Sequence, residues 1–502
     1  MSMALATMVL SSVLPLESAT AFVQPPLLSS QRTKNMLIPP PQRLVHQRRA
    51  ARPARTATSM AAGAAVDQGS DDLPRVLCHG EVLFDCIAIP DAAGWDLERV
   101  EESAAWAAYP GGAPANAACA LAKLGVPASF VGAVGRDEEG DELLKVLEAA
   151  GVGTELATRI DDFPTRTVMV TRDLAGDRTF AGFGGGKASD SFADCQHRLC
   201  EMEDAARGLL KPGSWVVQGT LGLAYPGSFE SHVCLAEWAQ EAGAVRFLDI
   251  NWRPVFWELA GEEGGSDYES LARERISAFA LTADVVKLTD EEAEWLCGVS
   301  GETALADPSC LQRFFPAAKA ILVTAGEKGA SYVIGDQTGS VPVFESINAV
   351  ETTGAGDAFS AGFISEAIKA LSAATVAATA AGESPLGVEG LGRASREGGD
   401  GDAAAAAAAA AASARDMVRF ASAVGALTCC GDGAIKPQPS RGDVLGLLQR
   451  EPHFFLRERV RDHFGVRVGG VNEWASLYIG LLIVVLCVVR RESRCTAWGL
   501  GV

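Results

Sequence analysis

Short apolar runs alternate with helical patterns through the middle of the chain, and this alternation constrains the fold more than any other feature. A β-rich run covers residues 76–87. Residues 137–150 open with acidic side chains, as a helix dipole favours, and then repeat apolar residues at helical spacing. The alternation predicts an α/β fold with a mostly parallel central sheet and helices on both faces. Further strands are expected at 128–134, 215–218, 246–250, 285–288, 320–324 and 331–334, and a further helix at 112–125.

A second pattern lies between residues 158 and 183, where stretches such as 165–171 and 178–180 alternate in polarity. Alternation of period two is typical of half-buried antiparallel strands. We therefore expect a small β-sheet lid beside the main sheet. Ligands in open α/β sheets bind beyond the carboxyl ends of the strands, so the chemistry is expected in the loops that follow them.

The charge of the chain favours small-molecule chemistry over nucleic-acid binding. Its formal net charge is -20, although residues 1–66 carry seven Lys or Arg against one acid, Glu17. The remainder is therefore strongly acidic, and an acidic body repels phosphate backbones. The twelve cysteines show no CxxC or Cys/His ligand spacing, which predicts reduced, mostly buried thiols.

Residues 1–66 have the composition of a targeting presequence in two parts. Residues 1–21 are apolar and small, as in a signal peptide, and residues 22–62 are basic, rich in Ser and Pro and free of acid, as in a transit peptide. The tandem resembles the bipartite presequences of algae with secondary plastids, which implies delivery to the plastid stroma. A disordered N-terminal tail is the alternative.

Two other segments are expected to contribute no chemistry. The C-terminal tail, residues 451–502, contains the uncharged run 474–489, which is shorter than the roughly 20 residues that span a bilayer comfortably. A short membrane anchor, a core helix and a tail outside the folded protein all remain open. Residues 372–414 read as a low-complexity insertion with ten consecutive alanines, expected to form a loop or a solvated helix.

The strongest motif is the glycine-rich run 351–359, which leads into a helical pattern. Backbone N–H groups of Gly354, Ala355 and Gly356 could face a phosphate at the helix N-terminus, where the dipole favours negative charge. Asp357 in the first helical turn could accept a proton from an attacking hydroxyl. An ordinary helix cap with an aspartate in its first turn is the competing interpretation.

A second motif, GGAPAN, covers residues 111–116. The paired glycines Gly111 and Gly112 permit close backbone approach to a ligand, and Asn116 offers both a donor and an acceptor to a diol. Upstream, Asp85 is expected to place its carboxylate at the end of the first strand. A tight turn that caps a core helix is the alternative explanation.

These motifs resemble the two signatures of the PfkB family of ribokinase-like carbohydrate kinases. Residues 351–359 match D-T-T-G-A-G-D-x-F except at Glu351, where the family usually has Asp and where that residue helps to hold a monovalent cation. The proline in GGAPAN makes this motif similar to the corresponding motif of fructokinases and 2-keto-3-deoxygluconate kinases. The resemblance implies a ribokinase-like three-layer sandwich over residues 67–450. It also implies that Asp357 is the general base and that Asp85 and Asn116 bind the sugar hydroxyls.

The resemblance also assigns roles to residues between these motifs. Arg253 would steady the substrate or the phosphates, and Glu292 would organise Mg²⁺ through water. No Walker P-loop is present, because Gly186-Lys187 is followed by Ala188. The expected ATP contacts are Lys287, Thr289, Thr324, Gly326, Gly329 and Ser422.

The predicted activity is ATP-dependent phosphorylation of a sugar primary hydroxyl, with fructose as the first choice of acceptor. Ribose, 2-keto-3-deoxygluconate or a nucleoside are alternatives, as is a catalytically silent scaffold that resembles the fructokinase-like proteins of plastid transcription. The expected ligands are the sugar, ATP, Mg²⁺ and a monovalent cation. A homodimer is a further option, whereas no nucleic-acid partner is expected.

Overall fold

The computed structural model describes residues 74–89, 105–172, 178–260, 267–380 and 400–451. The predicted presequence 1–66 and the hydrophobic segment 474–489 lie outside these residues and stay predictions. Among the described residues, no helix combines the length and apolar character that a membrane span requires.

The main sheet has nine strands in the order β13-β12-β11-β10-β9-β8-β1-β4-β5. Seven of them are parallel and two at one edge are antiparallel, so the predicted mostly parallel sheet is confirmed. The parallel strands are β1 (Val76–His79), β4 (Ala128–Gly135), β5 (Gly153–Ile160), β8 (Trp215–Gln218), β9 (Val245–Asp249), β10 (Val285–Thr289) and β11 (Ala320–Thr324); the antiparallel ones are β12 (Ala330–Ile334) and β13 (Gln337–Val341).

Helices cover both faces of this sheet because both faces of its strands are apolar. Val76 and Cys78 pack into one hydrophobic cluster and Leu77 into another, as the two-residue period of a strand requires. The first face carries α2 (Ala113–Lys123), α3 (Glu138–Ala149), α10 (Ala355–Ala380), α11 (Asp400–Thr428) and α12 (Arg441–Arg450). The other carries α4 (Glu203–Leu209), α5 (Pro226–Ala242), α6 (Pro254–Ala260), α7 (Tyr268–Ala280), α8 (Asp290–Cys297) and α9 (Gly301–Ala306). The three-layer sandwich is confirmed.

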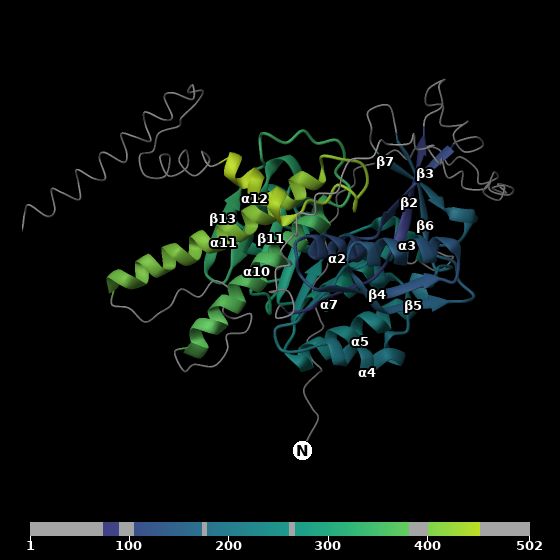
Figure 1. Ribbon diagram of the computed structural model, residues 1–502, viewed down its shortest axis with the longest axis horizontal. Helices are drawn as coiled ribbons and strands as arrows, with labels where there is room; N and C mark the ends of the chain where they lie inside the picture. Colours follow the sequence, from purple (N-terminus) through teal and green to yellow (C-terminus); the bar gives the residue numbers. More distant parts are fainter. Residues whose placement is uncertain (1–73, 90–104, 173–177, 261–266, 381–399, 452–502) are drawn as a thin grey trace, which may run out of the picture. The chain divides into compact units, whose positions relative to one another are not determined.

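A small four-stranded sheet has the order β3-β2-β6-β7. In Figure 1 the strands of this small sheet lie together, away from α10 and α11. The helices α10 and α11 lie side by side. The predicted lid strands near residues 165–180 are β6 (Thr167–Arg172) and β7 (Arg178–Phe183), joined by β2 (Leu83–Ile89) and β3 (Ala105–Gly111).

The run 76–87, expected as one strand, is in fact two strands in different sheets. β1 ends at His79 and β2 begins at Leu83, with Gly80 at a φ of 149° between them. A Cβ at Gly80 would lie 2.7 Å from Cγ of Pro114, so the chain turns there against the start of α2. Asp85 consequently lies within a strand of the small sheet, not at the end of the first strand of the main sheet.

The ten-alanine run of the predicted insertion lies in α11, and the preceding part of the insertion continues α10 as far as Ala380. Where α10 and α11 meet, small residues allow close packing. A Cβ at Gly362 would lie 2.8 Å from Cα of Ala421. The helices α10 and α11 therefore approach each other closely at Gly362, which lies on α10.

The expectation that the cysteines are all reduced is wrong for one pair. Cys200 and Cys234 form a disulfide between the 3₁₀ turn Leu199–Met202 and α5. The two cysteines are 34 residues apart, and only the folded chain brings them together.

Candidate active site

Polar residues gather at the carboxyl ends of three adjacent parallel strands. Lys287 of β10 is the register partner of Asp249 of β9, and Thr289 is the partner of Thr324 of β11. The Lys287 Nζ lies 3.1 and 2.9 Å from the two carboxylate oxygens of Asp249, and both side chains are buried. Burial lowers the pKa of Lys287, but the nearby carboxylates, Asp249 above all, outweigh this effect and leave it raised. The lysine is therefore a fixed positive charge at this edge of the sheet.

The first turn of α10, which follows the glycine-rich turn, lies against this ammonium group. A Cβ at Gly356 would be 2.9 Å from the Lys287 Nζ. Ser360, one helical turn later, donates to Oδ2 of Asp249 across 3.2 Å. Gly354 has a φ of 76°, and a Cβ there would lie 2.7 Å from Cβ of Ala434. The turn thus combines backbone N–H groups at a helix N-terminus with a buried cation, a combination suited to phosphate.

Asp357 lies in the first turn of α10 and meets Asn116 of α2. The Asn116 Nδ2 donates to Oδ2 of Asp357 across 2.8 Å. Loss of hydration, followed by the negative charge of Asp249, raises the pKa of Asp357 to about 6. The Asn116 hydrogen bond and the charges of Lys287 and Arg253 act in the opposite direction. Asp357 is therefore an ionised carboxylate at neutral pH whose proton affinity is well above that of an ordinary aspartate.

The predicted sugar residues cluster where the small sheet meets α2. A Cβ at Gly111 would be 2.7 Å from Oδ2 of Asp85, so this glycine lies against the carboxylate. Gly112 has a φ of 100°, and a Cβ there would be 2.5 Å from the carbonyl oxygen of Glu81. Gly112 is therefore required by its positive φ and by the backbone of Glu81, whereas Gly111 allows the Asp85 carboxylate to approach closely.

Glu81 was not anticipated from the sequence. Its side chain is buried, and Oε1 accepts from the backbone N–H of Ala113, the first residue of α2, across 3.0 Å. Burial raises the pKa of Glu81 to about 7, and the charges of Asp194 and Asp357 add to this effect. The residue lies in the same short segment as Asp85, but a lone carboxylate directly after a glycine carries no sequence signal for this contact.

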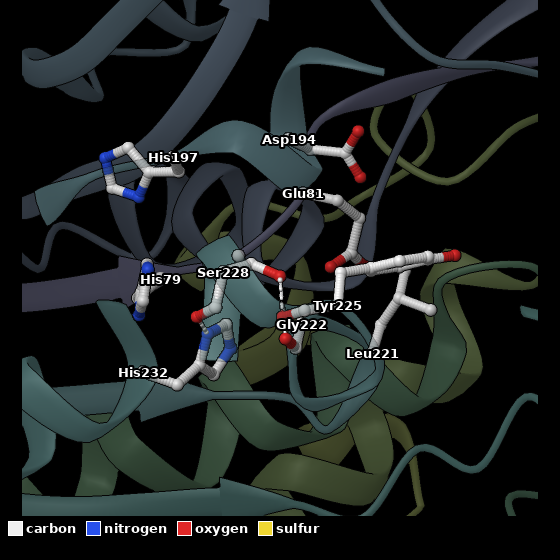
Figure 2. A pocket seen from close by; sticks show the side chains of 10 residues that line it. His79, Glu81, Asp194, His197, Leu221, Gly222, Tyr225, Ser228 and His232 are labelled. Atoms are coloured by element: carbon white, nitrogen blue, oxygen red, sulfur yellow. Dashed lines mark hydrogen bonds between the residues drawn. The ribbon is translucent and has the colours of Figure 1, made fainter. Parts of the chain in front are cut away.

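Glu81 also lines a small cavity of about 10 Å³, room for roughly one water molecule. In Figure 2 three histidines lie along one side of it, and Glu81, Asp194 and Tyr225 along the other. The rings of His79 and His232 are 4.2 Å apart, and burial lowers the pKa of His232 to about 4 and of His197 to about 3. The histidines are therefore neutral at pH 7.

The loop after β9 carries Arg253, which is exposed and donates from Nη1 to the carbonyl oxygen of Trp252 across 3.0 Å. Glu292 accepts from the backbone N–H of Trp252 at 2.7 Å and from that of Thr289 at 2.8 Å. Thr289 in turn caps α8 and completes a capping box with Glu292. Glu292 thereby ties the loop after β9 to the loop after β10.

Glu351 likewise connects two loops. It accepts from Thr353 Oγ1 at 2.7 Å and from the backbone N–H of Gly433 at 2.9 Å. The residue that departs from the family pattern therefore joins the glycine-rich turn to the loop after α11.

The remaining predicted ATP residues lie in the turn after β11 and on α11. Thr324 ends β11, while Gly326 and Gly329 have φ values of 50° and 91° in the turn that follows. Gly329 has a packing reason to be glycine, because a Cβ would be 2.4 Å from the carbonyl oxygen of Val341. Ser422 is half-buried on α11. The roles of these residues in ATP binding stay predictions.

The fold has three layers, and the Asp357–Asn116 pair lies at the glycine-rich turn that is suited to phosphate. This combination is that of a small-molecule kinase. A family model described as pfkB family carbohydrate kinase matches residues 73–390, and the chain belongs to this family. It is a fructokinase-like member, and the predicted carbohydrate kinase is confirmed.

Several relatives support this assignment. The chain is 32% identical to a probable chloroplastic fructokinase-6 of Arabidopsis thaliana over 61% of this chain and 73% of that protein. It is 30% identical to fructokinase-1 of Zea mays over 75% of this chain and 98% of that protein. The structure of a Xylella fastidiosa fructokinase with bound ATP has a TM-score of 0.57 and 27% identity, and covers 75% of this chain and 99% of that one.

Proposed function

We propose that this kinase transfers the γ-phosphoryl group of ATP to a primary hydroxyl of fructose, with Asp357 as the general base. The observation that carries the proposal is the Asp357–Asn116 pair, since it joins the carboxylate to the helix that begins with GGAPAN. The fructokinases of Arabidopsis and Zea mays and the ATP-bound fructokinase of Xylella support the choice of substrates.

In the proposed reaction the sugar hydroxyl oxygen attacks the γ-phosphorus, the bond from that phosphorus to the bridging oxygen breaks, and ADP leaves. The hydroxyl proton passes to the carboxylate of Asp357. Backbone N–H groups of Gly354, Ala355 and Gly356, with the charge of Lys287 beside them, would stabilise the negative charge on the transferred group. Asp85, Gly111, Gly112 and Asn116 would hold the sugar hydroxyls.

The proposed cations are Mg²⁺ and a monovalent cation, and the carboxylates that suit them are Glu292 and Glu351. Mg²⁺ usually keeps several waters and binds through substrate phosphates, and no cluster of three or more His, Cys, Asp or Glu with metal-ligand geometry occurs in the described part of the chain. Glu292, whose two oxygens each accept one backbone N–H, has lone pairs left for a metal-bound water. Glu351 would contribute to a monovalent cation site. Lys287, Thr289, Thr324, Gly326, Gly329 and Ser422 would contact ATP. Arg253 would steady the substrate or the phosphates.

Other acceptors remain candidates because the fold hosts several of them. Ribose, 2-keto-3-deoxygluconate and nucleosides are the alternatives, and a silent scaffold protein is the alternative from another class. The presequence composition and the chloroplastic Arabidopsis relative support a plastid location. Homodimer formation and membrane attachment through residues 474–489 stay predictions.

The test is ADP release by the full-length protein with MgATP and one acceptor at a time: fructose, ribose, glucose, 2-keto-3-deoxygluconate or adenosine. Turnover with fructose is expected. Turnover with another acceptor alone would retain the mechanism and replace the substrate, whereas a folded protein that binds ATP without turning over any acceptor would favour the scaffold.

A further inference from the structure

The helix that carries Asn116 begins without a cap of its own. Gly112 occupies the N-cap position of α2 and has no side chain that could accept a hydrogen bond. Pro114, the second residue of the helix, has no N–H group. The N–H of Ala113, the first residue of the helix, has no partner within the helix and must find one in another segment.

Glu81 is that partner. Its Oε1 accepts from the Ala113 N–H across 3.0 Å, although the two residues are 32 positions apart in the chain. The residue is only 8% exposed, so water competes little for this bond. A carboxyl group at a helix N-terminus also interacts favourably with the helix dipole. Glu81 therefore supplies, from the turn between β1 and β2, the cap that Gly112 cannot supply.

The backbone of the same turn fits closely against the start of α2. A Cβ at Gly112 would lie 2.5 Å from the carbonyl oxygen of Glu81 and 3.0 Å from Cα of Val82. One residue earlier in the turn, a Cβ at Gly80 would lie 2.7 Å from Cγ of Pro114. The turn and the start of the helix are therefore in direct contact, and the Glu81 side chain adds a hydrogen bond to this packing.

The other side of Glu81 faces the small cavity, whose wall is well held. Asp194 and Tyr225 line this cavity together with Glu81 (Figure 2). Asp194 Oδ2 accepts from Arg166 Nε across 2.8 Å, and both side chains are buried. The guanidinium carbon of Arg166 lies 5.5 Å from the ring centroid of Tyr225. Because the cavity has room for roughly one water molecule, this wall limits any movement of the Glu81 carboxyl group away from Ala113.

The Glu81–Ala113 bond lies next to the residues that are proposed to hold the sugar. Ala113 follows Gly112 directly, and the Asn116 N–H donates to the Gly112 carbonyl oxygen across 2.8 Å in the first turn of the helix. The Asn116 side chain in turn donates to Asp357 across 2.8 Å. A displacement of Ala113 would therefore move both Gly112 and Asn116 relative to the base.

A separate contact holds α2 beyond this first turn. Gln438 Nε2 donates to the backbone carbonyl oxygen of Asn116 across 2.9 Å. This bond acts on the C-terminal side of Ala113 and leaves the Ala113 N–H to Glu81. The loss of the Glu81 bond should consequently displace the start of α2 while the rest of the helix stays in place.

We propose that Glu81 is a positioning residue for the acceptor site, whose hydrogen bond to the Ala113 N–H places Gly112 and Asn116 for the sugar hydroxyls. The inference rests on the proposed function, because it gives the start of α2 a role in sugar binding. Glu81 acts through the backbone of α2 and is assigned no contact with either substrate.

The test compares the full-length variants Glu81→Leu, Glu81→Asp and Glu81→Gln with the wild type, using the acceptor that the wild type phosphorylates. Leu offers no acceptor atom, and the shorter Asp side chain does not reach the Ala113 N–H. Both variants should raise the KM for the sugar about tenfold, because the groups that hold it are misplaced, and leave the KM for ATP unchanged. Glu81→Gln keeps an acceptor oxygen at the same distance along the side chain and should keep the wild-type KM for the sugar.

Ser440→Ala is the matched control for the loss of a helix cap. Ser440 caps α12, a helix that carries none of the proposed site residues. Its replacement should lower the melting temperature without changing the KM for either substrate. A reduced stability alone therefore does not count as support for the positioning role.

A second readout is independent of turnover. Amide hydrogen exchange, measured by mass spectrometry on peptides that cover residues 111–117, should be faster in Glu81→Leu and Glu81→Asp and unchanged in Glu81→Gln and Ser440→Ala. Wild-type protein that phosphorylates no acceptor would defeat the proposed function, and the exchange pattern would still decide whether Glu81 holds the start of α2.

Three results would overturn the inference. The first is a wild-type KM for the sugar in Glu81→Leu and Glu81→Asp, which would leave Glu81 a purely structural role. The second is a Glu81→Gln protein as impaired as Glu81→Leu, since the hydrogen bond would then not be the cause. The third is an equal rise in the KM for ATP, which would indicate a general distortion of the site.

Discussion

Asn116 donates from Nδ2 to Oδ2 of Asp357 across 2.8 Å and so connects two residues 241 positions apart in the chain. One lies on the helix that begins with GGAPAN and the other on the helix that follows the glycine-rich turn. The same amide that is proposed to bind the sugar therefore also lowers the proton affinity of the base, against the larger effect of burial.

Replacing Asn116 by Ala should change the pH dependence of the reaction. The Asn116 hydrogen bond lowers the pKa of Asp357, so its loss raises that pKa above about 6. Because the base works as a carboxylate, the acid limb of the kcat/KM profile should move to higher pH. Lys123→Met, two turns further along α2, is the control and should leave the limb in place. An unmoved limb in Asn116→Ala would separate this amide from the base.

Gly354→Ala should damage the glycine-rich turn. A φ of 76° disfavours any side chain by about 1–2 kcal/mol, and the new Cβ would lie 2.7 Å from that of Ala434. We expect a lower melting temperature together with a large loss of kcat. Gly208→Ala is the matched control, because Gly208 lies on α4 with open space around it and should gain about 0.5–1 kcal/mol. Full activity in Gly354→Ala would show that the turn tolerates a different conformation.

Lys287→Met should destabilise the fold strongly. It leaves the buried carboxylate of Asp249 without its cation, and breaking such a pair typically costs about 3–5 kcal/mol in the free energy of unfolding. Denaturant unfolding should show this loss, and Asp249→Asn in the same chain should recover much of it. If the single and double variants were equally unstable, the ion pair would not be the cause.

Reduction of the Cys200–Cys234 disulfide should lower thermal stability. The bond closes a loop between residues 34 positions apart, for which about 2–4 kcal/mol is typical. Cys200→Ser should have a melting temperature that no longer responds to reductant, whereas Cys430→Ser, at an exposed free cysteine, should respond as the wild type does. A wild type that is insensitive to reductant would mean that the pair is reduced in solution.

The parallel sheet and the glycine-rich turn could be predicted because both are local patterns. Strands such as β4 and β8 are apolar on both faces, and the turn that begins a helix is visible in the consecutive residues 351–359. The division of residues 76–87 between two sheets was missed, because the break at Gly80 depends on contact with Pro114.

The site was predictable in its motifs and not in its contacts. Lys287 was predicted as an ATP contact, but its pairing with Asp249 requires the order in which β9 and β10 lie in the sheet. The contact of Glu81 with Ala113 and the stack of Trp252 on Trp295 each join segments that the sequence keeps apart. Such pairings depend on tertiary structure and leave no periodic signal.

The most direct test of the central claim is ADP release by Asp357→Asn, measured with its melting temperature and its affinity for ATP. General-base catalysis typically contributes about 10²–10⁴-fold, so turnover should fall by that order while ATP binding is retained. Stability should rise at pH 7–8: a folded-state pKa of about 6 lies above the ordinary aspartate value, so the penalty is absent at low pH and complete above pH 6. Loss of turnover in a more stable protein is the predicted result. Turnover equal to that of the wild type would contradict the assignment of Asp357 as the base.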